Sequence, residues 1–156
     1  MSDTVLIIDG HSMAFRAFYA LPPDNFVTAT GQHTNAVYGF VSMLTRLLET
    51  EQPTHVAVAF DVSRHSFRTE EYPEYKGTRD ATPEEFKGQV ELIREVLDAM
   101  GIVSLAREGF EADDILATLA YRAGNDGATV LVVSGDRDSF QTVTDNVTVL
   151  YPGTGP

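Results

Sequence analysis

Two kinds of apolar pattern alternate along the chain, and together they predict a layered α/β fold. Short, continuously apolar, β-branched runs predict buried strands at 4–9, 55–61, 102–106, the start of 129–138, and 146–151. Apolar residues spaced three and four apart predict helices at 11–20, 35–52, 82–101 and in "GFEADDILATLA" (109–120), with a short helix at "SFQTV" (139–143). Strands that are apolar throughout are typical of a parallel sheet covered on both faces. We therefore expect a mostly parallel central sheet with helices on both faces.

The helix predicted over 82–101 has the clearest end signals. Thr82 is placed as N-cap, Pro83 as first helical residue, Glu85 as partner in a capping box and Gly101 as terminator. Residues 62–82, just before it, show no period and are expected to form a loop.

Composition restricts the class of protein. A chain of 156 residues with 43% apolar content is enough for one domain, expected over 1–156. No apolar run is long enough for a membrane span, and the N-terminus lacks the basic region of a signal peptide. The absence of cysteine fits a reducing cytoplasm. A net charge of −12 argues against a broad positive surface for nucleic acid, unless many of the acids converge on bound cations.

Carboxylates follow several of the predicted strands. Asp9, Asp61 and the pair Asp136 and Asp138 come at or just after strand ends. In open parallel sheets, ligands bind in the crevice outside that edge. The helix in "GFEADDILATLA" begins at the same edge, so seven acids can point into one crevice: Asp9, Asp61, Glu111, Asp113, Asp114, Asp136 and Asp138.

Each acid also has an ordinary structural explanation. Asp9 before glycine is typical of a helix N-cap, and Asp61 and "GDRD" are typical of turns. Acids in the first turn of a helix are favoured by about 0.3–1 kcal/mol each. Glu111 and Asp114, three apart, share a helix face that Asp113 does not. These explanations do not account for convergence of the acids, because uncompensated carboxylates in a crevice raise their own pKa values or destabilise the fold.

Divalent cations would resolve that conflict. Oxygen ligands without His or Cys favour Mg²⁺ or Mn²⁺ over Zn²⁺. The carboxylates are too many for one octahedral ion, so we expect two ions. Two ions about 3.5–4 Å apart activate water and stabilise the leaving oxygen in phosphodiester cleavage.

A basic and aromatic loop follows Asp61. In "RHSFRTEEYPEYKGTR" (64–79), four basic residues are interleaved with three aromatic ones: Arg64, Arg68, Lys76, Arg79, Phe67, Tyr72 and Tyr75. This mixture suits a nucleic-acid strand, although a solvated loop paired internally with its three glutamates explains it equally well. Its position favours nucleic acid, because an arch-like loop over about 62–82 would lie above the acids and add positive charge around a phosphate.

Four segments carry a resemblance to a known family: "LIIDGHSMAFRAFYAL", "AVAFDVSRHSFRTEEYPEYKGTRDATPEEF", "GFEADDILATLA" and "VVSGDRDSFQTV". In this order they closely resemble the N-terminal 5′ nuclease domain of bacterial DNA polymerase I, in the flap-endonuclease family with a PIN-like core. The resemblance covers essentially the whole chain. It implies a structure-specific 5′–3′ exonuclease and flap endonuclease that acts on DNA 5′ ends, flaps or nicks, with RNA–DNA hybrids as a further substrate, in DNA replication and repair.

The resemblance also implies roles for individual residues. Asp9, Asp61, Glu111 and Asp113 match ligands of a first Mg²⁺ or Mn²⁺ ion; Asp136 and Asp138 match ligands of a second, with Asp113 as bridge and Asp114 nearby. Lys76 and Arg79 match the pair that engages the scissile phosphate. Tyr75, Arg16 and Arg68 resemble DNA-contacting residues, and His11 is expected to be a local hydrogen-bonding residue.

In the family, the nuclease domain continues with a helical element that grips the duplex, and a polymerase domain follows. The sequence ends at "YPGTGP", before either, so it is expected to be the N-terminal part of such a domain, and a monomer is the default expectation. The main alternative is a non-catalytic module that binds DNA and metal. A PIN-type ribonuclease needs no basic arch, and a phosphoryl-accepting domain needs a late lysine, whereas Lys87 is the last.

Overall fold

The computed structural model describes residues 3–62 and 82–151. A five-stranded sheet in the order β3-β2-β1-β4-β5 forms its centre, and every registered pair in it is parallel. The strands are β1 (Thr4–Asp9), β2 (His55–Ala59), β3 (Val103–Leu105), β4 (Thr129–Val133) and β5 (Val147–Leu150). The predicted α/β class and all five predicted strands are confirmed.

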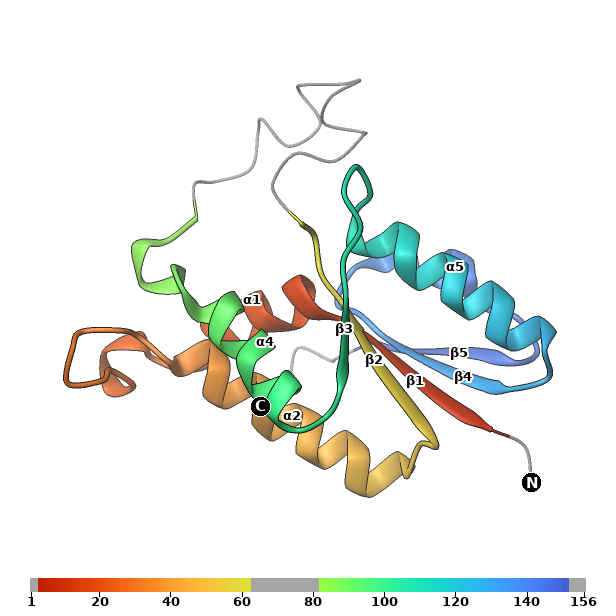
Figure 1. Cartoon of the computed structure of the whole chain (residues 1–156), viewed down its shortest axis with the longest axis horizontal. Helices are drawn as coiled ribbons and strands as arrows, with labels where there is room; N and C mark the ends of the chain where they lie inside the picture. Colours follow the sequence, from red (N-terminus) through yellow and green to blue (C-terminus); the bar gives the residue numbers. More distant parts are fainter. Residues whose placement is uncertain (1–2, 63–81, 152–156) are drawn as a thin grey trace.

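Helices cover both faces of the sheet, as predicted (Figure 1). They are α1 (Gly10–Ala20), α2 (Asn35–Glu51), α4 (Gln89–Ala99) and α5 (Ala112–Asn125). The first three pack on one face and α5 packs on the other. Single 3₁₀ turns, η1 (Pro23–Asn25) and η3 (Glu84–Phe86), and a longer one, η4 (Arg137–Thr142), complete the described elements.

The alternation of side chains along each strand creates two separate cores. On β1, Leu6 and Ile8 face α1, α2 and α4, while Ile7 faces α5. Both groups are fully buried. Continuous apolar strands are therefore required here, because each face of the sheet has its own helical layer.

One helix prediction is wrong. The segment predicted as a single helix over 82–101 begins instead with η3, and α4 starts only at Gln89. Gly88 interrupts the helix with φ +82°, a conformation that glycine adopts without steric cost. Thr82, Pro83 and Glu85 therefore do not start a helix as their spacing suggested. Packing outweighs the capping pattern, since Phe86 is buried and stacks on Phe15 with ring centroids 4.3 Å apart.

The order of the strands determines where a ligand site is expected. The chain runs outward from β1 to β2 and β3, then crosses to β4 and β5 on the other side of β1. The switch point therefore lies between the carboxyl ends of β1 and β4, where open α/β sheets bind ligands. No helix in the described parts of the chain has the length and apolar character needed to span a membrane.

Candidate metal centre

Asp9 ends β1 at the switch point and is also the N-cap of α1. Its Oδ1 accepts the backbone N–H of Ser12 at 3.2 Å, and its Oδ2 accepts the hydroxyl of Ser134 at 3.1 Å. The residue is only 5% exposed. The interpretation of Asp9 as a cap is correct, but one cap does not explain a buried carboxylate that also bonds across the sheet to the segment after β4.

Gly10 allows this corner to pack tightly. A Cβ on Gly10 would overlap the ring of Phe60, which is fully buried just beyond β2. A larger residue at position 10 would therefore push α1 away from the end of β2.

Asp61 lies just past β2 and is fixed from two sides. Its Oδ1 accepts the backbone N–H of Ala112, the first residue of α5, at 2.6 Å. Its own backbone N–H donates to Nδ1 of His11 at 3.1 Å, which makes His11 a local hydrogen-bonding residue as expected. Three segments distant in sequence, at residues 11, 61 and 112, are thus joined at the same edge of the sheet.

The acids at the start of α5 divide into two groups. Glu111 is the N-cap and Asp114 closes a capping box, with its Oδ2 accepting the backbone N–H of Glu111 at 3.0 Å. Asp113 does not take part in the box, and its carboxyl group instead lies close to that of Asp9. Glu111 and Asp114, which were predicted to share a helix face, thus cap the start of α5 together, while Asp113 is directed into the crevice.

The contact between Asp9 and Asp113 concentrates negative charge. Burial, followed by the carboxylate of Asp113, raises the pKa of Asp9 from 3.8 to about 7. Burial, followed by the carboxylate of Asp136, raises the pKa of Asp113 to about 6, and Glu111 and Asp61 add to the repulsion. These five residues, Asp9, Asp61, Glu111, Asp113 and Asp136, are called the acidic cluster below.

The segment after β4 completes the described part of the cluster. The backbone N–H of Asp136 donates to Oγ of Ser134 at 3.1 Å. Arg16 reaches the same place from α1, since its Nη1 is 4.0 Å from the point that a Cβ on Gly135 would occupy. Asp138 falls in η4, but its side chain lies outside the described part of the structure.

Several predicted site residues lie outside the described residues altogether. Arg68, Tyr75, Lys76 and Arg79 all fall between 63 and 81, as does nearly all of the predicted arch over about 62–82. Their roles remain predictions from the sequence.

The donor set of the acidic cluster fits a hard divalent cation. It consists of carboxylate oxygens only, the ligands that Mg²⁺ and Mn²⁺ prefer, and burial together with neighbouring carboxylates raises the pKa values of Asp9 and Asp113. Within 3–62 and 82–151, no three aspartate, glutamate or histidine side chains are already arranged to hold an ion.

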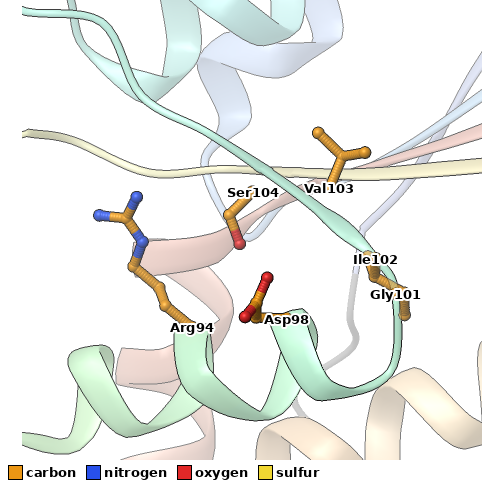
Figure 2. Close-up of a pocket in the computed structure, with 6 residues that line it drawn as sticks. All are labelled: Arg94, Asp98, Gly101, Ile102, Val103 and Ser104. Atoms are coloured by element: carbon orange, nitrogen blue, oxygen red, sulfur yellow. The ribbon is translucent and has the colours of Figure 1, made fainter.

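A separate hollow lies between α4 and β3. It has a volume of about 470 Å³, and Arg94, Asp98 and Ser104 are among the residues that line it (Figure 2). The guanidinium carbon of Arg94 is 5.3 Å from the centroid of the Phe60 ring. No residue of the acidic cluster lines this hollow, so the cluster and the hollow are different features.

The sequence analysis missed two residues of the site, Ser12 and Ser134. Both are hydroxyl residues within three positions of an acid at a strand end, in "DGHS" and "SGD". That proximity is a usable signal, because short hydroxyl side chains commonly bond to nearby backbone and carboxylate groups.

Comparison with known proteins identifies the family of the chain. A model of the family described as "5′-3′ exonuclease, N-terminal resolvase-like domain" matches residues 4–155. DNA polymerase I of Mycobacterium tuberculosis is 60% identical over 152 residues, which is 97% of this chain but only 17% of that protein. The chain thus spans about a sixth of the curated relatives it matches.

Two solved structures of the phage T5 D15 protein share the fold. One was co-crystallized with metal ions and has a TM-score of 0.74 at 24% identity, covering 95% of this chain and 55% of that one. The other, a flap endonuclease in a pseudo-enzyme-product complex with DNA and metal ions, has a TM-score of 0.66 at 25% identity, covering 95% and 54%. On the match to residues 4–155, the chain belongs to the 5′-3′ exonuclease family of nucleases, as its N-terminal resolvase-like domain.

Proposed function

We propose that the chain is the metal-binding core of a structure-specific 5′–3′ exonuclease and flap endonuclease that hydrolyses DNA phosphodiester bonds with two Mg²⁺ or Mn²⁺ ions. One observation carries the proposal. Asp9 from the end of β1 and Asp113 from the start of α5 meet at the switch point, with Asp61, Glu111 and Asp136 close enough to raise their pKa values.

The described residues have distinct tasks in this proposal. Asp9 and Asp113 present carboxylate oxygens toward each other, and Asp113 is the proposed bridge between the ions. Asp61 is oriented by the N–H of Ala112, which donates to its Oδ1, while its Oδ2 lies 3.7 Å from Nδ1 of His11. Glu111 and Asp114 fix the first turn of α5 and thereby the direction of Asp113.

Divalent cations, when bound, supply activation of the attacking water and stabilisation of the leaving oxygen. The proposed ligands follow the sequence prediction: Asp9, Asp61, Glu111 and Asp113 for one ion, and Asp136 and Asp138 for the other, with Asp114 nearby. Lys76 and Arg79 are proposed to contact the scissile phosphate, where positive charge stabilises the transition state. Arg16, which lies beside Gly135, is proposed to contact DNA together with Arg68 and Tyr75.

DNA with a 5′ end, flap or nick is the proposed partner, and an RNA–DNA hybrid is a further one. The similar T5 flap endonuclease complex contains DNA and metal ions together, which supports this choice. The similar polymerases suggest a polymerase domain covalently linked to the nuclease in the intact protein. We propose a monomer that works in the cytoplasm, since a chain without cysteine suits a reducing compartment.

Cleavage of a labelled 5′-flap duplex by the 156-residue chain in Mg²⁺ tests the proposal. The chain should cut near the flap junction, and Asp113→Asn should abolish cutting because the bridging carboxylate is lost. Equal cleavage by both proteins would refute the two-ion scheme. Lys76→Ala should slow cleavage much more than it weakens DNA binding, because its charge acts on the transition state.

The alternative is a non-catalytic module that binds DNA and metal. Its basis is that the chain covers only 17% of its polymerase relatives and 55% of a T5 structure. Flap binding without any cleavage, even with protein in excess over DNA, would favour this module.

A further inference from the structure

The two serines that the sequence analysis missed occupy a position between the proposed ion sites. We infer that Ser134 and Ser12 are positioning residues, which keep the carboxylates of Asp9 and Asp136 in register across the switch point so that the acidic cluster can bind divalent cations. This inference rests on the proposed function and assigns a metal-positioning role to side chains that are not ligands themselves.

Ser134 directly links Asp9, at the end of β1, with Asp136, in the segment after β4. Its hydroxyl donates to Oδ2 of Asp9 at 3.1 Å and accepts the backbone N–H of Asp136 at 3.1 Å. The residue is fully buried, so water does not compete for either bond. One oxygen atom therefore connects a carboxylate proposed for the first ion with the backbone of a residue proposed for the second.

Ser12 makes the reciprocal connection. Its backbone N–H donates to Oδ1 of Asp9 at 3.2 Å, and its Oγ accepts the backbone N–H of Gly135 at 2.9 Å. A Cβ on Gly135 would lie only 3.0 Å from that Oγ, so glycine allows the close approach. Each serine thus bonds both to Asp9 and to the segment after β4.

Together the serines leave Asp9 little freedom to rotate. One oxygen of Asp9 is bonded from α1 and the other from the segment after β4. Residues that orient metal ligands in this way typically contribute about 10–100-fold to metal affinity.

A purely structural role is the competing explanation, since buried polar atoms need partners in any protein. Ser104 of β3 offers a matched control. Its Oγ is also buried, and it has no hydrogen-bond partner among the described residues. Ser104→Ala removes a buried hydroxyl without touching the acidic cluster.

Binding of Mn²⁺ to the 156-residue chain, followed by electron paramagnetic resonance and calorimetry without DNA, provides the test. We expect Ser134→Ala to raise the apparent Kd about tenfold or more, and Ser12→Ala to raise it less. Ser104→Ala should bind like the unaltered chain. Ser12→Thr, which keeps the hydroxyl, should retain most of the affinity that Ser12→Ala loses. If Ser134→Ala does not fold, the comparison of these two Ser12 variants tests the positioning role.

The possible outcomes distinguish the positioning role from the metal site itself. If the unaltered chain binds Mn²⁺ and the serine-to-alanine variants bind it equally well, the positioning role is refuted while the proposed metal site stands. If Ser104→Ala loses as much affinity as Ser134→Ala, the effect is structural and the inference is again refuted. If the unaltered chain binds no Mn²⁺, the proposed function fails, and the inference fails with it.

Discussion

Two buried polar clusters lie at opposite ends of α1, and they are built on opposite principles. The amide network, Asn35 and Gln89, lies where α1, α2 and α4 meet, and both residues are fully buried. The acidic cluster lies at the carboxyl ends of the strands. The first consists of neutral groups that satisfy each other, whereas the second brings like charges together.

Gln89 supplies a cap that α2 cannot make for itself. The N-cap residue of α2, Thr34, makes no side-chain capping bond, because its hydroxyl donates to the carbonyl of Phe26 at 3.3 Å. Instead, Oε1 of Gln89 accepts the N–H groups of Ala36 at 2.7 Å and Val37 at 3.2 Å. Its Nε2 donates to Oδ1 of Asn35 at 2.8 Å and to the carbonyl of Glu85 at 2.9 Å. Both donors and both lone pairs of this amide are therefore used.

Asn35 extends the network to the end of α1. Its Nδ2 donates to the carbonyls of Phe18 at 2.8 Å and Leu21 at 3.0 Å. The end of α1, the start of α2 and the start of α4 are therefore joined through two side chains.

The two clusters therefore differ in what they contribute: the amide network stabilises the fold, whereas the acidic cluster costs stability and is the candidate functional site. Fully satisfied neutral groups stabilise a fold and specify its packing. Clustered carboxylates raise each other's pKa values and lower stability unless something neutralises them. The acidic cluster is thus a region where the fold gives up free energy that a bound cation would restore.

Breaking the amide network should give the largest loss of stability. We expect Gln89→Ala to lower the free energy of unfolding by about 3 kcal/mol, because several buried donors and acceptors lose their partner. Urea denaturation followed by circular dichroism measures the change. The exposed Gln141 offers the control, since Gln141→Ala should change the stability very little. A similar loss of stability in both variants would show that the amide network contributes no more to stability than an exposed glutamine does.

Changing the pH should affect the acidic cluster next most strongly. The pKa of Asp9 is about 7 in the folded chain, against 3.8 ordinarily, so between these values the folded state binds more protons than the unfolded state. Stability should therefore fall as the pH rises through this window. Because the loss runs over about two pH units up to the folded pKa, at about 1.4 kcal/mol per unit, the metal-free chain should be about 2.5 kcal/mol less stable at pH 8 than at pH 5.

Thermal or urea unfolding in a chelator, repeated across this pH range, measures the slope. Asp9→Asn should flatten it, because the titrating group is removed. Mg²⁺ added at pH 8 should restore stability to the unaltered chain. A metal-free stability that rises from pH 5 to pH 8 would contradict the raised pKa.

The same contrast explains what the sequence could predict. The strands and the convergence of acids at their ends follow from short-range patterns: continuous apolar runs, each followed by a carboxylate. Those patterns placed Asp9, Asp61 and Asp136 correctly at one edge of the sheet. Local patterns suffice there, because parallel strands bring their carboxyl ends together whatever the details of packing.

The features that sequence reasoning missed depend on partners far away in the chain. Gln89 caps α2, which begins 54 residues earlier in the chain. It is also the first residue of α4, so this helix starts at Gln89 and not at Thr82, where the capping pattern had predicted it. Ser134 bonds to a carboxylate 125 positions away. A single sequence contains no periodic signal for such pairs, since each depends on how separate elements pack.

The smallest effect concerns two adjacent acids of α5 that the structure assigns to different tasks. Asp113 faces Asp9 and is repelled by Asp136, so Asp113→Asn should stabilise the metal-free chain, by about 1 kcal/mol, through relief of repulsion. Asp114 closes the capping box, so Asp114→Asn should destabilise it by about 0.5 kcal/mol through loss of favourable charge at the helix N-terminus. Urea unfolding at pH 8 in a chelator compares the two. Opposite signs at neighbouring positions cannot arise from net charge, which both substitutions change equally. Destabilisation by Asp113→Asn as well would show that the acidic cluster stores no repulsion at this position.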